Sequence, residues 1–184
     1  EYTLRIQARQ AVPLNRIDLV FSFSESFCRE KLLFFNNGFC TNDFAFITEI
    51  GSDAVVSRDL LLYQNERGQN FNLAVTTAER FLTRFISTAE GTVLRYYMED
   101  KFLVPGEEYR LEQFVVDERM EGGAFFAAYA SFMAQKHHIV LPKSIDSGWS
   151  SWSCYYGNVT EDRVLLQSEN MKREFSALGA DLIQ

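Results

Sequence analysis

Apolar and polar residues alternate, with interruptions by turn residues, through roughly the first two thirds of the chain. Residues 2–8 alternate strictly, and residues 17–23 do so more loosely. A period of two is typical of strands that bury one face, and no helical pattern separates these segments. The 17 Phe residues, most of them in this region, also suit half-buried antiparallel strands. The pattern predicts an antiparallel sandwich or barrel, and we expect a sandwich.

Turn signals set the boundaries of the expected strands. Asn65-Glu66-Arg67-Gly68 predicts a hairpin loop with glycine where a positive φ is needed. Ala89-Glu90-Gly91 does the same, and Pro105-Gly106 predicts a type II turn. The expected strands are residues 2–8, 17–23, 31–35, 54–63, 70–75, 80–87, 92–98 and 109–116.

The alternating pattern ends at about residue 116. An acidic, glycine-containing stretch at 117–123 precedes an alanine-rich segment, 124–134, whose large apolar residues recur at helical spacing. Such a helix is apolar nearly all round, so we expect it to be wedged between the sandwich and the carboxyl-terminal part of the chain. We therefore divide the chain into a sandwich at 1–120, a helical linker at 121–145 and a third part at 146–184.

The third part has the pattern of one β-α-β unit. An aromatic strand from Ser147 opens into a Tyr-Tyr-Gly loop, and Thr160 is placed to cap a helix that stops at Gly179 before a second strand. One apolar stripe is expected on this helix, formed by Val164, Ser168, Met171, Phe175 and Leu178. In parallel α/β folds the catalytic and ligand-binding residues lie in the loops that follow the carboxyl ends of the strands.

Trp152 is the candidate ligand contact of this unit. On a strand, Trp149 and Trp152 would point to opposite faces, so both cannot pack in one layer. Trp152 lies nearer the carboxyl end, where a flat ring can hold the less polar face of a sugar. Packing in the core is the structural alternative for either indole.

Composition excludes several other classes. A net charge of −7 without a basic run argues against nucleic acid or an anionic membrane as a partner, and no apolar run reaches the roughly 20 residues that span a bilayer. His137 and His138 are expected to be linker residues, because no further ligand is spaced to form a metal site. Cys28, Cys40 and Cys154 are widely spaced and odd in number, which favours reduced thiols in a cytoplasmic protein.

One resemblance joins these features. The run Gly148-Trp-Ser-Ser-Trp-Ser-Cys-Tyr-Tyr-Gly-Asn-Val-Thr-Glu-Asp162, followed by a helix and a strand ending in Ile-Gln, resembles the start of the catalytic barrel in melibiase-type α-galactosidases, the family-36 glycoside hydrolases. Residues 102–112 are similar to the closing strands of that family's amino-terminal sandwich. One departure is that Asn37-Gly38-Phe39 continues into Cys40, without the family's Gln-Ser-Trp.

The resemblance implies a mainly β fold, a supersandwich-like β-sandwich followed by a linker helix and the first β-α-β of a (β/α)8 barrel. It also implies a retaining hydrolase of terminal α-galactosides, with two catalytic aspartates on later barrel strands. None of the carboxylates in this chain matches them, since Asp146 and Asp181 fall at strand starts. By matching position, Trp152, Tyr155 and Tyr156 would contact an α-galactoside oligosaccharide, with helix packing as the alternative for the two tyrosines. No cofactor or metal is expected, and a homo-oligomer is left open.

Two other functions remain open from the sequence. The sandwich could be a carbohydrate-binding or assembly module without hydrolytic activity. The same fold could also carry out α-galactosyl transfer, as in raffinose-type synthases. The 184-residue chain alone is expected to be inactive because it lacks the catalytic aspartates.

Overall fold

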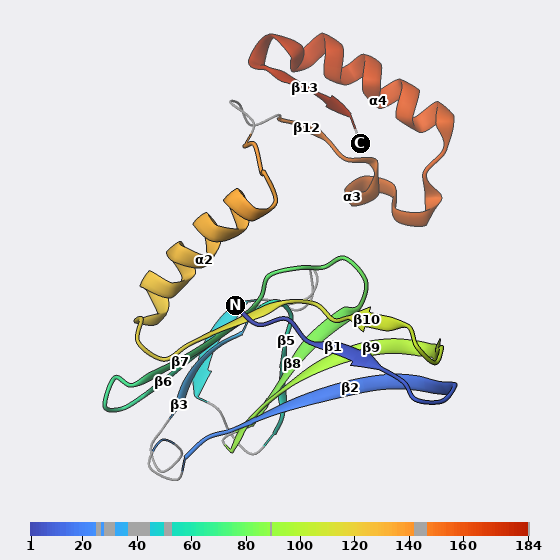
Figure 1. Cartoon of the computed structure of the whole chain (residues 1–184). Helices are drawn as coiled ribbons and strands as arrows, with labels where there is room; N and C mark the ends of the chain where they lie inside the picture. Colours follow the sequence, from blue (N-terminus) through green and yellow to red (C-terminus); the bar gives the residue numbers. More distant parts are fainter. Residues whose placement is uncertain are drawn as a thin grey trace. The chain divides into compact units, whose positions relative to one another are not determined.

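The structure, a computed structural model, is mainly β and antiparallel, as the alternation predicts. It describes residues 1–24, 27, 32–36, 45–49, 53–88, 90–141 and 147–183. The chain forms two compact units, Glu1–Ile139 and Val140–Gln184 (Figure 1). Asn37 to Cys40, Cys28 and Asp146 lie outside the described residues.

Two antiparallel sheets form the first unit. The five-stranded sheet has the order β11 (Phe114–Asp117), β7 (Asn70–Val75), β6 (Leu60–Asn65), β3 (Leu32–Asn36), β4 (Phe46–Glu49). The four-stranded sheet has the order β2 (Val12–Ser22), β9 (Gly91–Leu103), β8 (Leu82–Thr88), β5 (Val55–Ser57). A short pair, β1 (Arg5–Gln7) and β10 (Glu108–Arg110), accompanies them.

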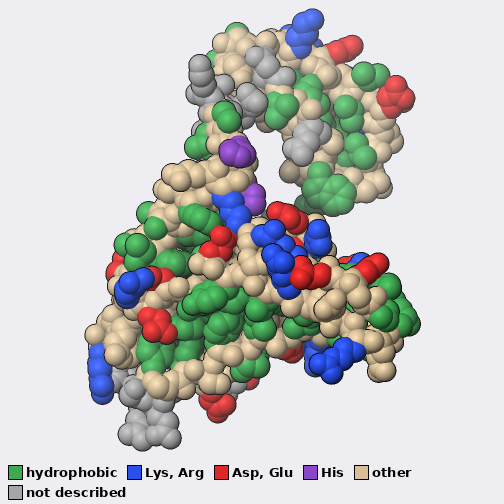
Figure 2. Space-filling view, in the orientation of Figure 1, with side chains coloured by type: hydrophobic (Ala, Val, Ile, Leu, Met, Phe, Trp, Pro, Cys, Tyr) green, Lys and Arg blue, Asp and Glu red, His purple; other side chains and the backbone are tan. Residues whose placement is uncertain are grey.

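Side chains from both sheets meet in one core. Leu61 and Leu73 come from the five-stranded sheet and Phe85, Leu94 and Tyr96 from the four-stranded one, and all five are fully buried. This is the expected result of alternation, because every second residue of β8, and of β9 as far as Met98, is buried. On the face shown in Figure 2, hydrophobic side chains also gather on the surface of this unit, with charged side chains around them.

The hairpins at Gly68 and Gly91 are confirmed, but two expected strands are each broken in two. Residues 54–63 form β5 and β6, which belong to different sheets. Arg58 and Asp59 carry the chain from one sheet to the other, and the Ser57 hydroxyl closes the corner on the Leu60 carbonyl at 2.6 Å. Residues 109–116 likewise divide into β10 and β11. In both places a strand-like alternation continues through a corner, which periodicity cannot detect.

A buried carboxylate explains the second break. Glu112 is only 2% exposed, and it lies between β10 and β11. Its oxygens accept hydrogen bonds from the Thr77 hydroxyl and from the backbone amides of Glu79 (3.0 Å), Arg80 (2.6 Å) and Phe81 (3.0 Å). Burial alone would raise the pKa of Glu112, but these donors outweigh it and hold the pKa below its ordinary value. Glu112 thus fixes the loop between β7 and β8 to the strand break.

Helix α2 (Gly122–Lys136) follows the sandwich, as predicted, and begins at a side-chain cap. The Glu121 carboxylate accepts from the backbone amides of Gly123 and Ala124. Phe125 and Tyr129 pack on the five-stranded sheet, and the Tyr129 hydroxyl donates to the Val75 carbonyl at 2.7 Å. Phe126 and Phe132 of the same helix are 50% and 37% exposed, so α2 also has large apolar side chains that the sandwich does not fully cover. The expected position of the helix between the sandwich and the carboxyl-terminal part stays a prediction.

The second unit contains a parallel strand pair joined by a helix, which confirms the predicted β-α-β arrangement. β12 (Ser147–Trp149) pairs with β13 (Ala180–Ile183), and between them lie α3 (Ser151–Tyr155), the 3-10 turns η1 (Tyr156–Asn158) and η2 (Ser176–Leu178), and α4 (Glu161–Glu174). Thr160 caps α4 by accepting from the Arg163 amide, and Gly179 has a φ of 79°. The start of α4 was therefore correctly predicted from local chemistry, whereas its end was not, because α4 ends at Glu174 and Gly179 caps the 3-10 turn η2.

Burial is low throughout this unit. None of the residues whose exposure is described in this unit is buried, and Leu165 and Leu166 of α4 are each 56% exposed. Of the expected stripe, Val164, Ser168 and Met171 are half-buried. Phe175 and Leu178 are exposed because α4 ends at Glu174 and the helical spacing is lost there.

Candidate functional site

The first candidate site follows the carboxyl end of β12. The strand was expected to continue to Trp152, but β12 ends at Trp149 and α3 starts at Ser151. The alternation argument for opposite faces therefore does not apply, and the expected strand position of Trp152 is wrong. Trp152 is still the third residue after the strand end, and its side chain is 63% exposed. Four aromatic residues crowd this turn, and they fall into two pairs.

The inner pair is Trp149 and Tyr155. Their rings meet edge to face at 6.0 Å, and the indole nitrogen of Trp149 donates to the Cys154 sulfur at 3.2 Å. The Arg163 guanidinium lies over the Tyr155 ring at 5.1 Å, and Gln167 donates to the Tyr155 hydroxyl at 3.2 Å. Contacts from strand and helix thus hold Tyr155, and they tie α3 to α4. Its role as a sugar contact stays a prediction.

The outer pair is Trp152 and Tyr156. Their rings are 5.7 Å apart at 74°, and Tyr156 is 62% exposed. Tyr156 has a φ of 49° and a ψ of −130°, a backbone conformation that glycine adopts readily and other residues rarely do. Holding a tyrosine there costs about 1–3 kcal/mol, and such strain is found most often at functional sites. The pair presents two flat rings to solvent beside a strand end.

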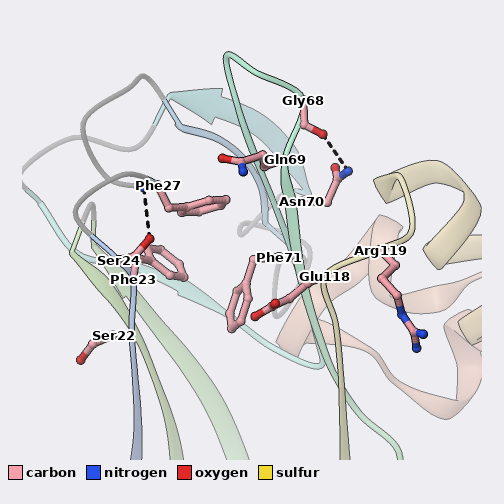
Figure 3. Close-up of a pocket in the computed structure, with 10 residues that line it drawn as sticks. All are labelled: Ser22, Phe23, Ser24, Phe27, Gly68, Gln69, Asn70, Phe71, Glu118 and Arg119. Atoms are coloured by element: carbon pink, nitrogen blue, oxygen red, sulfur yellow. Dashed lines mark hydrogen bonds between the residues drawn. The ribbon is translucent and has the colours of Figure 1, made fainter.

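A second candidate site lies in the first unit, at the end of the sandwich where β2 finishes (Figure 3). It is a groove of about 580 Å³, within the range of about 300–1,000 Å³ typical of small-ligand pockets. Phe23, Phe27 and Phe71 line it, and Phe23 contacts the other two rings at 5.0 and 5.2 Å. The β6–β7 loop and the segment before α2 complete the lining.

The polar groups of this groove differ in orientation. Figure 3 shows the Glu118 carboxylate beside the Phe71 ring and the Gln69 carboxamide on the side of Phe27, while Arg119 points away from the rings. The Asn65 side chain donates to the side-chain carbonyl oxygen of Gln69 at 2.7 Å, which positions the amide group of Gln69. Asn70 is held by Gly68 and Gln64. This groove was not predicted from the sequence, although Phe21 and Phe23 at alternate positions near a strand end were a signal for it.

The aromatic lining continues beyond this groove. A neighbouring hollow of about 350 Å³ shares Ser22, Phe71 and Glu118 with it and adds Tyr2 and Phe114. Successive ring centroids lie 5.3 Å apart for Tyr2–Phe114, 5.9 Å for Phe114–Phe21, 6.3 Å for Phe21–Phe71 and 5.2 Å for Phe71–Phe23. The two hollows therefore follow one row of aromatic rings between β2 and β11, which are edge strands of their sheets.

Among the residues that the structure describes, no group of three or more side chains is suited to hold a metal ion. The His137 ring bonds the Thr76 carbonyl at 2.8 Å, as expected for a hydrogen-bonded linker histidine. Within the same residues, no helix combines the length and apolar character needed to cross a bilayer.

Comparison with known proteins adds no family assignment. No protein-family model matches the chain, and a search of curated protein sequences finds no similar protein.

Proposed function

We propose that this chain is part of a retaining α-galactosidase of the melibiase type, and that the second unit is the first β-α-β of its (β/α)8 barrel. The observation that carries the proposal is the exposed indole of Trp152 just after the carboxyl end of a strand in a parallel pair. Parallel barrels place their substrate sites at that end of the strands.

The exposed apolar residues of the second unit support the barrel. Leu165 and Leu166 of α4 and Leu182 of β13 are each about half exposed. In a barrel, neighbouring β-α units would cover both the sheet pair and the helix flanks. Gly148 is also consistent with closely paired barrel strands. A Cβ there would lie 1.9 Å from the Leu182 carbonyl oxygen, so β12 and β13 can approach this closely only with glycine at this position.

In this proposal the outer pair forms one wall of the galactose site. The Trp152 ring would lie against the less polar face of the sugar, and Tyr156 would close the corner beside it. Tyr155 would support the wall from behind, since its ring and hydroxyl are held by Arg163 and Gln167. This assigns different roles to the three residues that the resemblance implied.

The chemistry itself would be performed by groups outside this chain. In a retaining mechanism one carboxylate attacks the anomeric carbon while a second protonates the departing oxygen, and the glycosidic bond breaks. Water then attacks the glycosyl-enzyme, the second group takes its proton, and the first carboxylate is released. What this chain would contribute is binding and orientation of the sugar.

The test is an assay of the full-length natural protein that carries this sequence. We expect it to release nitrophenol from nitrophenyl α-galactoside and not from the β-anomer, while the 184-residue chain alone releases none. Trp152→Ala should raise KM about tenfold, the loss expected for one stacked ring. Arg173→Gln, at an exposed position in the last turn of α4, should leave KM unchanged. Absence of α-galactoside hydrolysis by the full-length protein would refute the proposal.

A further inference from the structure

We infer that the groove of the first unit is a binding site for a neutral oligosaccharide, separate from the Trp152 wall of the second unit. The inference does not depend on the barrel or on hydrolytic activity. It rests on three features of the groove: its row of aromatic rings, the polar groups beside them and its charge.

The aromatic row supplies the apolar half of such a site. Phe71 and Phe23 are half-buried and packed against the core, so their positions are fixed by the sandwich before any ligand binds. Preorganised rings lose little side-chain entropy on binding. A series of rings along an open groove suits a chain of sugar rings, each of which has a face of C–H groups.

The polar half is supplied by Glu118 and Gln69, on two sides of the rings in Figure 3. Glu118 is exposed, and no described residue pairs with its carboxylate. Asn65 donates to the side-chain carbonyl oxygen of Gln69, and this bond fixes the orientation of the Gln69 amide group. The amide hydrogens of Gln69 have no partner among the described residues. A carboxylate accepts hydrogen bonds from two neighbouring hydroxyls, and an amide donates to a third.

Charge selects among ligand classes. Of the two charged residues in the described lining, Glu118 lies beside the rings, whereas Arg119 points away from them and its side chain is 93% exposed. A carboxylate in the groove of a chain with a net charge of −7 disfavours phosphate, nucleic acid and anionic sugars. A neutral ligand with many hydroxyls and apolar faces fits both the rings and the carboxylate.

The experiment is an NMR titration of the complete 184-residue chain with raffinose and, separately, maltotriose, both neutral trisaccharides. We expect the side-chain amide signals of Gln69 and the backbone signals of 21–23 and 116–119 to shift. Both Trp residues lie in the second unit, so Trp fluorescence in the same titration reports on that unit alone. Failure of the proposed galactose wall and failure of the groove site are therefore observed separately.

Conservative substitutions limit the loss of stability, since Glu118 is exposed and Phe71 is half-buried. Glu118→Gln should raise the dissociation constant about tenfold, the effect of losing one charge-assisted hydrogen bond. Phe71→Leu, which keeps apolar volume but removes the flat ring, should raise it about fivefold. Glu99→Gln should have no effect, since it makes the same chemical change at an exposed position of β9 eight residues beyond Gly91, the partner of Ser22.

Three results would overturn the inference. The first is that neither trisaccharide shifts these signals. The second is a shift that is the same in wild type and Glu118→Gln. The third concerns a peptide of alternating valine and threonine, added in place of the sugars. If it shifts the backbone amide signals of β2 more strongly than either sugar shifts those of Gln69, the groove is a site where an extended strand docks.

Discussion

The two units of this chain contrast in what holds them together. The first has a core of fully buried side chains from two sheets, whereas in the second no residue whose exposure is described is buried. Yet the second unit has well-formed local features, including a capped helix, a left-handed glycine stop and a parallel strand pair. Local signals can thus define elements completely where they bury almost nothing.

This contrast has an energetic meaning. Burial of apolar area is the main favourable contribution to folding, at roughly 25 cal/mol per Å². Caps and turns contribute about 1 kcal/mol each and do not outweigh the entropy of ordering a segment as long as the second unit. We therefore expect cooperative unfolding of the first unit and local, low-energy opening of the second. Paired substitutions test that difference, from the largest effect to the smallest.

The largest effect is expected from one phenylalanine in each unit. Phe85 is fully buried between the sheets and Phe175 is 47% exposed. Phe85→Ala should lower the free energy of unfolding of the first unit by about 4 kcal/mol, through lost burial and a cavity. Phe175→Ala should change it by less than about 0.5 kcal/mol. Urea denaturation followed by circular dichroism measures both, and equal effects would contradict the contrast.

The second effect concerns the buried carboxylate. Glu112→Gln replaces one oxygen that accepts two hydrogen bonds by an amide group that cannot, so it should cost about 3 kcal/mol. Glu118→Gln, the same change at an exposed position, should cost almost nothing. The same urea denaturation measures both variants, and an equal loss in the two would show that burial of Glu112 is not the cause.

The pH dependence gives Glu112 a further signature. Its pKa is lowered in the folded state, so the stabilisation by ionised Glu112 is complete above the ordinary pKa of a glutamate. It is lost as the pH falls through that value toward the lowered one, because the unfolded chain takes up the proton first. The difference in unfolding free energy between wild type and Glu112→Gln should shrink between about pH 7 and about pH 3. A stability difference that is constant over that pH range would show that ionisation of Glu112 does not stabilise the folded state.

A third pair of changes adds the same methyl group to both units. A Cβ on Gly91 would lie 2.2 Å from the Phe21 carbonyl oxygen, and one on Gly148 would lie 1.9 Å from that of Leu182. Gly91→Ala should destabilise the first unit by about 2 kcal/mol, because the sheet must shift to admit the methyl group. Gly148→Ala should remove the hydrogen-exchange protection of β12 and β13 without changing the unfolding midpoint of the first unit. A shift of that midpoint would mean that the two units unfold together.

The same contrast explains what the sequence could predict. Alternation and turn residues predicted most strands of the first unit, and capping chemistry predicted the start of α4. What failed in the first unit depended on contacts distant in sequence. The breaks at Arg58-Asp59 and at Glu112 occur where a strand changes partner, and Glu112 is fixed by donors about 31–35 residues away.

The candidate sites follow the same division. Trp152, Tyr155 and Tyr156 were identifiable from a local motif, although the strand assumed for Trp152 was wrong. The groove was not, since its lining comes from the end of β2, the β6–β7 loop and the segment before α2. No single stretch of sequence contains these residues, and only the pairing of the strands brings them together.

The smallest expected effect has the opposite sign. Tyr156 is held at a φ of 49° and a ψ of −130°, so Tyr156→Gly should stabilise the second unit by about 1 kcal/mol through relief of strain. Loss of the ring contact with Trp152 offsets part of this gain. Tyr155→Gly is the matched control: Tyr155 has a negative φ, and the change should destabilise the unit by removing the contacts with Trp149, Arg163 and Gln167. Amide exchange of α4 measures both changes. If Tyr156→Gly slows amide exchange and weakens sugar binding, the strained backbone serves to present the ring. If it speeds exchange, Tyr156 is a packing residue and the outer pair is not a binding surface.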